Sequence, residues 1–158
     1  MNKDIFKEII NKQLNAFYWV GDYPYGNMLM QVEDHFYEIS NFCKEEYSSF
    51  DIKELDLFTD FKPVDEGDID VYAIRENILN INVIRDIIDV DNTDHLEFDM
   101  CIEITTDKHK YLLSRDYLYD EAINIDIDKL DIKFINGLSY KLLIDGNLGL
   151  LLNRVSNF

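Results

Sequence analysis

Several carboxylates in this chain stand two residues apart, a spacing that could hold a metal ion. The pairs are Asp68 and Asp70, Asp89 and Asp91, and Asp126 and Asp128. On a strand, residues two apart share one face about 7 Å apart, so a divalent cation could bridge them in principle. A calcium loop starting at Asp89 would need glycine where Asp94 stands and glutamate where Met100 stands. Such pairs also arise by chance in an acidic chain, so the sequence predicts no specific metal site.

Three histidines and two cysteines could in principle form a catalytic pair. His35 and His95 each follow an acid, and no histidine stands at metal-ligand spacing from a cysteine or another histidine. Cys43 and Cys101 are far apart and lie among apolar residues, a pattern typical of reduced, buried thiols. Surface histidines are the favoured interpretation, and a cysteine–histidine pair formed only on folding stays an alternative.

The sequence shows no sign of a nucleotide or nucleic-acid site. Gly137, Gly146 and Gly149 lie in or near expected hairpin turns, and no lysine and hydroxyl pair follows them as in a phosphate-binding loop. Binding to DNA or RNA requires clustered lysine and arginine, and this chain has 15 basic residues against 32 acids. We therefore expect no cofactor and no direct contact with nucleic acid.

The acidic residues are concentrated in the middle third of the chain. Residues 51–103 contain 16 acids and four bases, which supply −12 of the formal charge of −17. A local field of this kind attracts a basic surface and repels nucleic acid and anionic membranes. The charge distribution thus predicts a basic protein partner.

Length and composition predict one globular domain over residues 1–158. The 158 residues are 47% hydrophobic and 13% aromatic, too apolar for a disordered chain and enough for a core without disulfides or metal. Charged residues interrupt the N-terminal hydrophobics, unlike in a signal peptide, and no apolar run approaches the ~20 residues of a membrane helix. We expect a cytoplasmic protein that does not contact membranes.

The elements that would position these residues divide into early helices and late strands. Apolar residues from Ile5 to Phe17 recur at helical spacing, which predicts a helix that ends near Val20. A second helix is expected over residues 34–47, although residues 28–32 also alternate as a strand would. A short amphipathic segment over residues 52–61 ends before Pro63.

Strand patterns dominate the second half. A strand is favoured after Asn77, and strict alternation predicts a hairpin from Glu97 to Ser114. Residues 123–127 alternate likewise, and Asp145-Gly146 favours a terminal hairpin. We therefore predict an α+β fold with N-terminal amphipathic helices packed on a largely antiparallel sheet built from C-terminal hairpins.

These observations favour an acidic protein inhibitor that blocks the nucleic-acid-binding surface of a nuclease-type effector. Two settings fit equally: an immunity protein against a bacterial toxin, or a phage anti-defence (anti-CRISPR-like) DNA mimic. Two tyrosines of an aromatic turn would serve as interface anchors, unless they only rim the core. The residues expected to bind the partner are Asp65, Glu66, Asp68, Asp70, Asp86, Asp89, Asp91, Asp94, Tyr23 and Tyr25.

Two other classes of function remain as alternatives. A small carboxylate-based hydrolase would need a deep pocket in which carboxylates have separated pKa values. A structural or adaptor subunit of a larger assembly would use its acids only for solubility. No catalytic motif is present, so the sequence predicts that the chain is not an enzyme.

Overall fold

The computed structural model describes residues 3–20, 27–43, 47–55, 69–90, 94–114, 123–128 and 150–157. In these ranges the chain forms one short helix and nine strands. They are α1 (Lys3–Ile9), β1 (Gln13–Val20), β2 (Asn27–Val32), β3 (His35–Cys43), β4 (Tyr47–Leu55), β5 (Ile69–Val90), β6 (Asp94–Thr106), β7 (Lys110–Ser114), β8 (Asn124–Ile127) and β9 (Leu150–Asn157).

The strands form a single sheet that closes on itself. Their order is β8-β7-β6-β4-β3-β2-β1-β5-β9, and β5 also pairs with β6, so that β1 to β6 make a ring. The pairings are antiparallel except for β4 with β6, which are parallel over two residue pairs, Tyr47 with Glu97 and Ser48 with Phe98. The ring brings the N-terminal strands against β5 and β6, which places distant parts of the sequence side by side.

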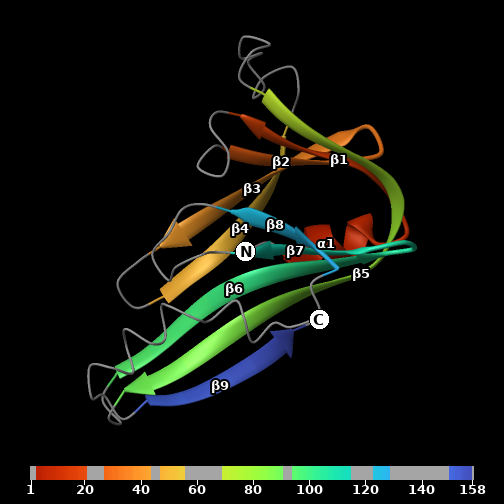
Figure 1. The fold of residues 1–158 in the computed structure, drawn as a ribbon. Helices are drawn as coiled ribbons and strands as arrows, with labels where there is room; N and C mark the ends of the chain where they lie inside the picture. The colour runs from red at the N-terminus through yellow and green to blue at the C-terminus, as the bar shows by residue number, and fades with distance from the viewer. Residues whose placement is uncertain are drawn as a thin grey trace.

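The long strand β5 connects the two halves of the sheet. Its first part pairs with β1, and its second part lies between β6 and β9, so the strand bends as it passes from one group to the other (Figure 1). The β1–β5 register shifts between Leu14 and Ala16, opposite Arg75, which has a φ of 65°. A left-handed residue at such a bulge increases the local twist, which explains the bend.

The core lies inside the ring, and α1 contributes to it. Phe6 and Ile9 of the helix are almost fully buried in the same cluster as Phe17 and Tyr111. The ring of Tyr111 packs edge-on against Phe17, with centroids 5.9 Å apart. Burial of large side chains from the helix and both halves of the sheet supplies the main stabilising term of the fold.

The predicted α+β class is wrong, because the protein is nearly all antiparallel β-sheet with one short helix. The predicted helix through Phe17 ends at Ile9, and residues 13–20 form β1. Leu14 and Phe17 are both buried because a register shift near Asn15 changes the phase of the strand. This bulge places apolar residues three apart on one face, a spacing that imitates a helix.

The predicted second helix is also a strand. Residues 35–43 form β3, in which Tyr37 and Ile39 point into the core and Phe36 is half-buried on the other face. Because both faces of β3 carry apolar side chains, apolar and polar residues do not alternate clearly along this strand. The apolar residues instead recur at a spacing that resembles a helix. The sheet is thus built from both halves of the chain, not from C-terminal hairpins alone.

The strand predictions of the second half are confirmed where the structure describes them. β6 and β7 form the expected hairpin around Asp107 and Lys108, and β8 coincides with the alternating segment 123–127. The strand expected after Asn77 is part of β5. The first arm of the expected terminal hairpin lies outside the described residues, and β9 pairs with β5.

Candidate functional site

The structure describes the backbone of four of the ten residues expected at the interface. Asp86 and Asp89 lie near the end of β5, and Asp94 begins β6 opposite Val90, so these three share one end of the β5–β6 pair. Asp70 lies at the opposite end of β5, beside β1. Tyr23, Tyr25, Asp65, Glu66, Asp68 and Asp91 lie outside the described residues. The predicted interface therefore stays a prediction.

Part of the acidic stretch serves the interior of the protein. Asp99 is completely buried, and its Oδ1 accepts a hydrogen bond from Nε of Arg85 at 2.7 Å. The Nη1 atom of the same arginine donates to Oε2 of Glu97 at 3.0 Å. The hydrogen bond to Asp99 raises the pKa of Arg85 above its ordinary value, against the opposing effect of burial.

A second internal pair lies on the same strand. Nζ of Lys110 is 3.1 Å from Oε2 of Glu103, a largely buried carboxylate whose Oε1 accepts a hydrogen bond from Asn82 at 3.2 Å. Partners of opposite charge and hydrogen bonds are what a buried carboxylate requires. Asp99 and Glu103 are therefore paired inside the protein and are not available to a partner.

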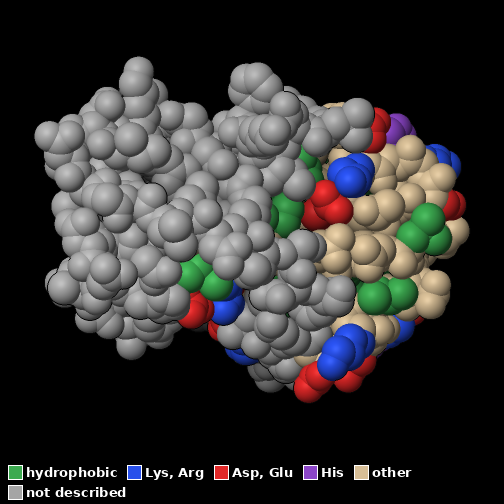
Figure 2. Space-filling model, turned by 90° about the horizontal axis from the view of Figure 1, so that it is seen from below, with side chains coloured by type: hydrophobic (Ala, Val, Ile, Leu, Met, Phe, Trp, Pro, Cys, Tyr) green, Lys and Arg blue, Asp and Glu red, His purple; other side chains and the backbone are tan. Residues whose placement is uncertain are grey.

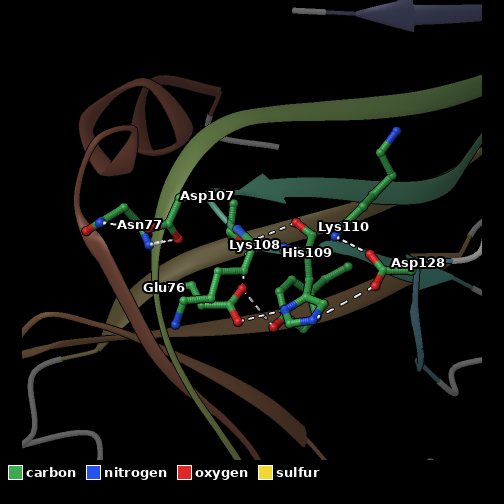
Figure 3. Close-up of polar contacts among 9 residues, drawn as sticks. Glu76, Asn77, Asp107, Lys108, His109, Lys110 and Asp128 are labelled. Carbon is green, nitrogen blue, oxygen red and sulfur yellow. Dashed lines mark hydrogen bonds and ion pairs between the residues drawn. The ribbon is translucent and has the colours of Figure 1, made fainter.

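Among the described residues, a dense cluster of polar contacts surrounds Glu76 of β5 (Figure 3). This carboxylate is 5% exposed. Its Oε2 accepts hydrogen bonds from the hydroxyls of Thr106 at 2.6 Å and Tyr111 at 3.0 Å, and its Oε1 lies 2.7 Å from Nδ1 of His109. Burial raises the pKa of Glu76, but the three hydrogen bonds and the nearby imidazole outweigh it, so the pKa lies below its ordinary value.

The same cluster fixes the turn between β6 and β7. The Oδ1 of Asp107 accepts a hydrogen bond from the backbone amide of Asn77 at 2.9 Å, which lowers the pKa of Asp107. His109 lies between Glu76 and Asp128, with its Nε2 4.0 Å from Oδ2 of Asp128 (Figure 3). Side chains from three elements thus hold the turn against the bulge of β5.

A carboxylate–imidazole contact also orients the general base in many hydrolases. In this cluster, however, the hydroxyls of Thr106 and Tyr111 both bond to Glu76, so neither is positioned for activation by His109. The second ring nitrogen of His109 faces another carboxylate, Asp128. The contacts therefore favour a structural role for the Glu76 cluster over a catalytic one.

A different set of exposed carboxylates acts electrostatically on Tyr37 of β3. Glu54 of β4 is the cross-strand neighbour of Tyr37, and Glu8 comes from α1. Burial is the main cause that raises the pKa of Tyr37, and the negative charges of Glu54, Glu8 and Glu33 raise it further. We call Glu8, Glu33, Glu54 and the adjacent Asp34 the acidic rim.

The turn that carries part of the acidic rim is firmly anchored. Glu33 has a φ of 52°, and its amide donates to the carbonyl of Gln13 at 2.8 Å. Its own carbonyl accepts hydrogen bonds from Asn15 at 2.9 Å and Gln31 at 3.1 Å. On the neighbouring strand, Glu54 is oriented by Nδ1 of His35 at 2.6 Å. The backbone at Glu33 and the side chain of Glu54 are therefore held in place, and the carboxylates of the rim are exposed.

Sequence reasoning missed both clusters. It paired His35 with its neighbouring acids, whereas the structure pairs it with Glu54, and His109 bonds to an acid 33 residues away. Neither pairing leaves a local signal, because cross-strand neighbours are set by register. Cys101 is a buried thiol, as expected.

Within the described ranges, no group of three or more histidine, cysteine, aspartate or glutamate side chains could hold a metal ion. The described part of the chain also contains no helix long and apolar enough to cross a membrane. By its fold, the described part of the protein is a closed, nearly all antiparallel β-sheet, and this sheet carries the acidic rim. No family model matches the chain, and comparisons with the curated proteins and the solved structures find no match.

Proposed function

We propose that this chain is an acidic binding protein that occupies the basic surface of a nucleic-acid-binding protein and thereby inhibits it. The observation that carries the proposal is the formal charge of −17, to which the acidic rim contributes exposed carboxylates from α1, the β2–β3 turn and β4. Folding does not require so large an excess of acid, because like charges in proximity destabilise the compact state. A function in binding gives a reason for this excess.

The charge of the described surface is consistent with this role but is not uniform. Eight acids and four bases are exposed among the described side chains. On the face drawn in Figure 2, acidic and basic side chains are mixed over the described part. The excess of acid is therefore local. A partner of matching shape would recognise it at the acidic rim and at the acids of residues 65–94 that are expected to bind the partner.

The partner class follows from physical chemistry. Proteins that bind nucleic acid neutralise phosphates with grooves of lysine and arginine, and a fixed acidic surface can occupy such a groove. Opposite charges accelerate association and make it sensitive to salt. A nuclease-type effector, either a bacterial toxin or a host defence enzyme, has the required groove.

The experiment combines capture with site-directed variants. The protein is immobilised, and partners from cells are bound at low salt, eluted at high salt, identified and purified. Nucleic-acid binding by the purified partner is then measured with and without the protein. Kinetics are compared for two variants that each lose two charges from the β2–β4 region, Glu33→Gln/Asp34→Asn on the rim and Glu38→Gln/Asp51→Asn on the outer face.

We expect a basic partner whose nucleic-acid binding is abolished at equimolar protein. The rim variant should slow association about tenfold at low salt, and the outer-face variant should change it much less. The proposal is refuted if salt releases no basic protein, if the partner still binds nucleic acid in the complex, or if the two variants behave alike.

A further inference from the structure

We propose that a single internal water molecule binds between Oδ2 of Asp99, the guanidinium of Arg85 and the backbone at Met100. The site lies where β5 pairs with β6, and it does not depend on the proposed function. Three features of the molecule meet there: a buried oxygen without a hydrogen bond, an ion pair bonded through one contact, and a β-bulge.

The carboxylate of Asp99 uses only one of its two oxygens. Its side chain is completely buried, and Oδ1 accepts a hydrogen bond from Nε of Arg85 at 2.7 Å. Within the described part of the chain, Oδ2 is buried and has no hydrogen-bond partner. A buried charged oxygen without a partner is costly, so such atoms in folded proteins are normally bonded to protein groups or to ordered water. Oδ2 of Asp99 therefore requires a donor.

The ion pair between Arg85 and Asp99 has one contact where its chemistry allows two. A guanidinium presents the N–H of Nε and one N–H of Nη2 along the same edge, which matches the two oxygens of a carboxylate. Arg85 donates from Nε to Asp99, and from Nη1 to Oε2 of Glu97 at 3.0 Å, but not to Oδ2 of Asp99. A molecule between the two groups would accept a hydrogen bond from the guanidinium and donate one to Oδ2.

A β-bulge next to this pair supplies further polar groups. Asp99 and Cys101 of β6 are opposite adjacent residues of β5, so Met100 between them is the extra residue of the bulge. The extra residue is left out of the ladder, and its amide and carbonyl need other partners. Met100 is 1% exposed, so these groups have little access to bulk solvent. An internal water makes about two to four hydrogen bonds, and this site offers that number.

Water fits this site better than an ion or a side chain does. Arg85 would repel a cation, and Asp99 would repel an anion. The complete burial of Asp99 excludes the side chains of a binding partner. Two donors of the same part of the sheet, Lys110 and Asn82, are bonded to Glu103. The ligand is therefore a small neutral molecule that donates and accepts hydrogen bonds at once.

A high-resolution crystal structure of the wild-type protein tests the site directly. We expect an ordered water at roughly 2.7–3.0 Å from Oδ2 of Asp99 and within hydrogen-bond distance of Arg85. A second hydrogen bond that runs straight from Arg85 to Oδ2, or an Oδ2 with no water beside it, overturns the inference.

Water–amide NOEs in solution give a second readout. The amides of Asp99 and Met100 should show cross peaks to water with the sign of a long-lived internal molecule. The double variant Arg85→Met/Asp99→Leu replaces the ion pair by apolar side chains, a change that proteins often tolerate, and should abolish these cross peaks.

Glu103→Gln is the matched control, because it changes an acid of the same strand whose two oxygens are bonded to other groups. It should leave the cross peaks unchanged. The amide spectrum reports whether each variant is folded, and the wild-type crystal structure decides the matter if the double variant is not. Cross peaks that persist in a folded double variant, or that disappear equally in the control, refute the water site.

Discussion

Replacement of Glu76 by glutamine tests the structural role of its cluster. The variant keeps the size of the side chain but removes the charge that three donors share. A hydrogen bond to a charged group contributes roughly 1.5–3 kcal/mol and one between neutral groups roughly 0.5–1.5, so each bond loses about 1 kcal/mol. We expect Glu76→Gln to lower the free energy of unfolding by about 3 kcal/mol and Tm by about 6–12 °C.

The pH dependence gives a second, independent readout. The pKa of Glu76 in the folded protein lies below its ordinary value of about 4.5. A carboxylate with a lowered pKa contributes stability that is complete above the unfolded pKa and is lost as the pH falls through the folded pKa. The difference in stability between the wild type and Glu76→Gln should therefore be constant near pH 7 and shrink below pH 4.5.

Urea denaturation from pH 7 downward measures both effects. Glu33→Gln is the matched control, because the same chemical change at an exposed position should alter stability by less than about 0.5 kcal/mol. The reasoning fails if Glu76→Gln costs less than about 1 kcal/mol at pH 7, or if its cost does not decrease in acid.

Two other substitutions test the remaining polar contacts. Arg85→Met leaves the buried carboxylate of Asp99 without its cation and should cost about 3 kcal/mol in chemical denaturation. The double variant Arg85→Met/Asp99→Asn should recover part of that loss, and a double variant no more stable than the single one would contradict this account. Asp107→Ala removes the acceptor of the Asn77 amide, so hydrogen exchange of that amide should become faster. An unchanged exchange rate would show that Asp107 does not protect it.

The strand content of the second half was predictable because alternation is a local property. Residues from Phe98 to Thr105 alternate without interruption, and the structure forms β6 there, followed by a polar turn and β7. The helix predictions in the first half were wrong because β-bulges interrupt the alternation of apolar and polar residues there. Leu14 and Phe17 share the core despite odd spacing, and only the pairing of β1 with both neighbours reveals the shift.

The candidate site was less predictable than the fold. The acids with the highest local density in the sequence were expected to bind a partner, yet Asp99 and Glu103 of the same stretch proved to be internal. Conversely, Glu8 lies outside the acidic stretch, and Glu54 lies inside it but was not among the residues expected at the interface. Their electrostatic effect on Tyr37 depends on how the sheet closes, and charge density along the chain carries no information on that.

The amino-acid sequence by itself determined the large negative charge, its concentration in the middle third, and the alternation of the later strands. These are properties of composition and of neighbouring residues. Only the tertiary structure decided that Glu76 would meet His109 inside the fold and that Glu54 would meet His35 across two strands. The physical reason is that register and strand closure set contacts between residues far apart in sequence, and these contacts depend on the whole sheet at once.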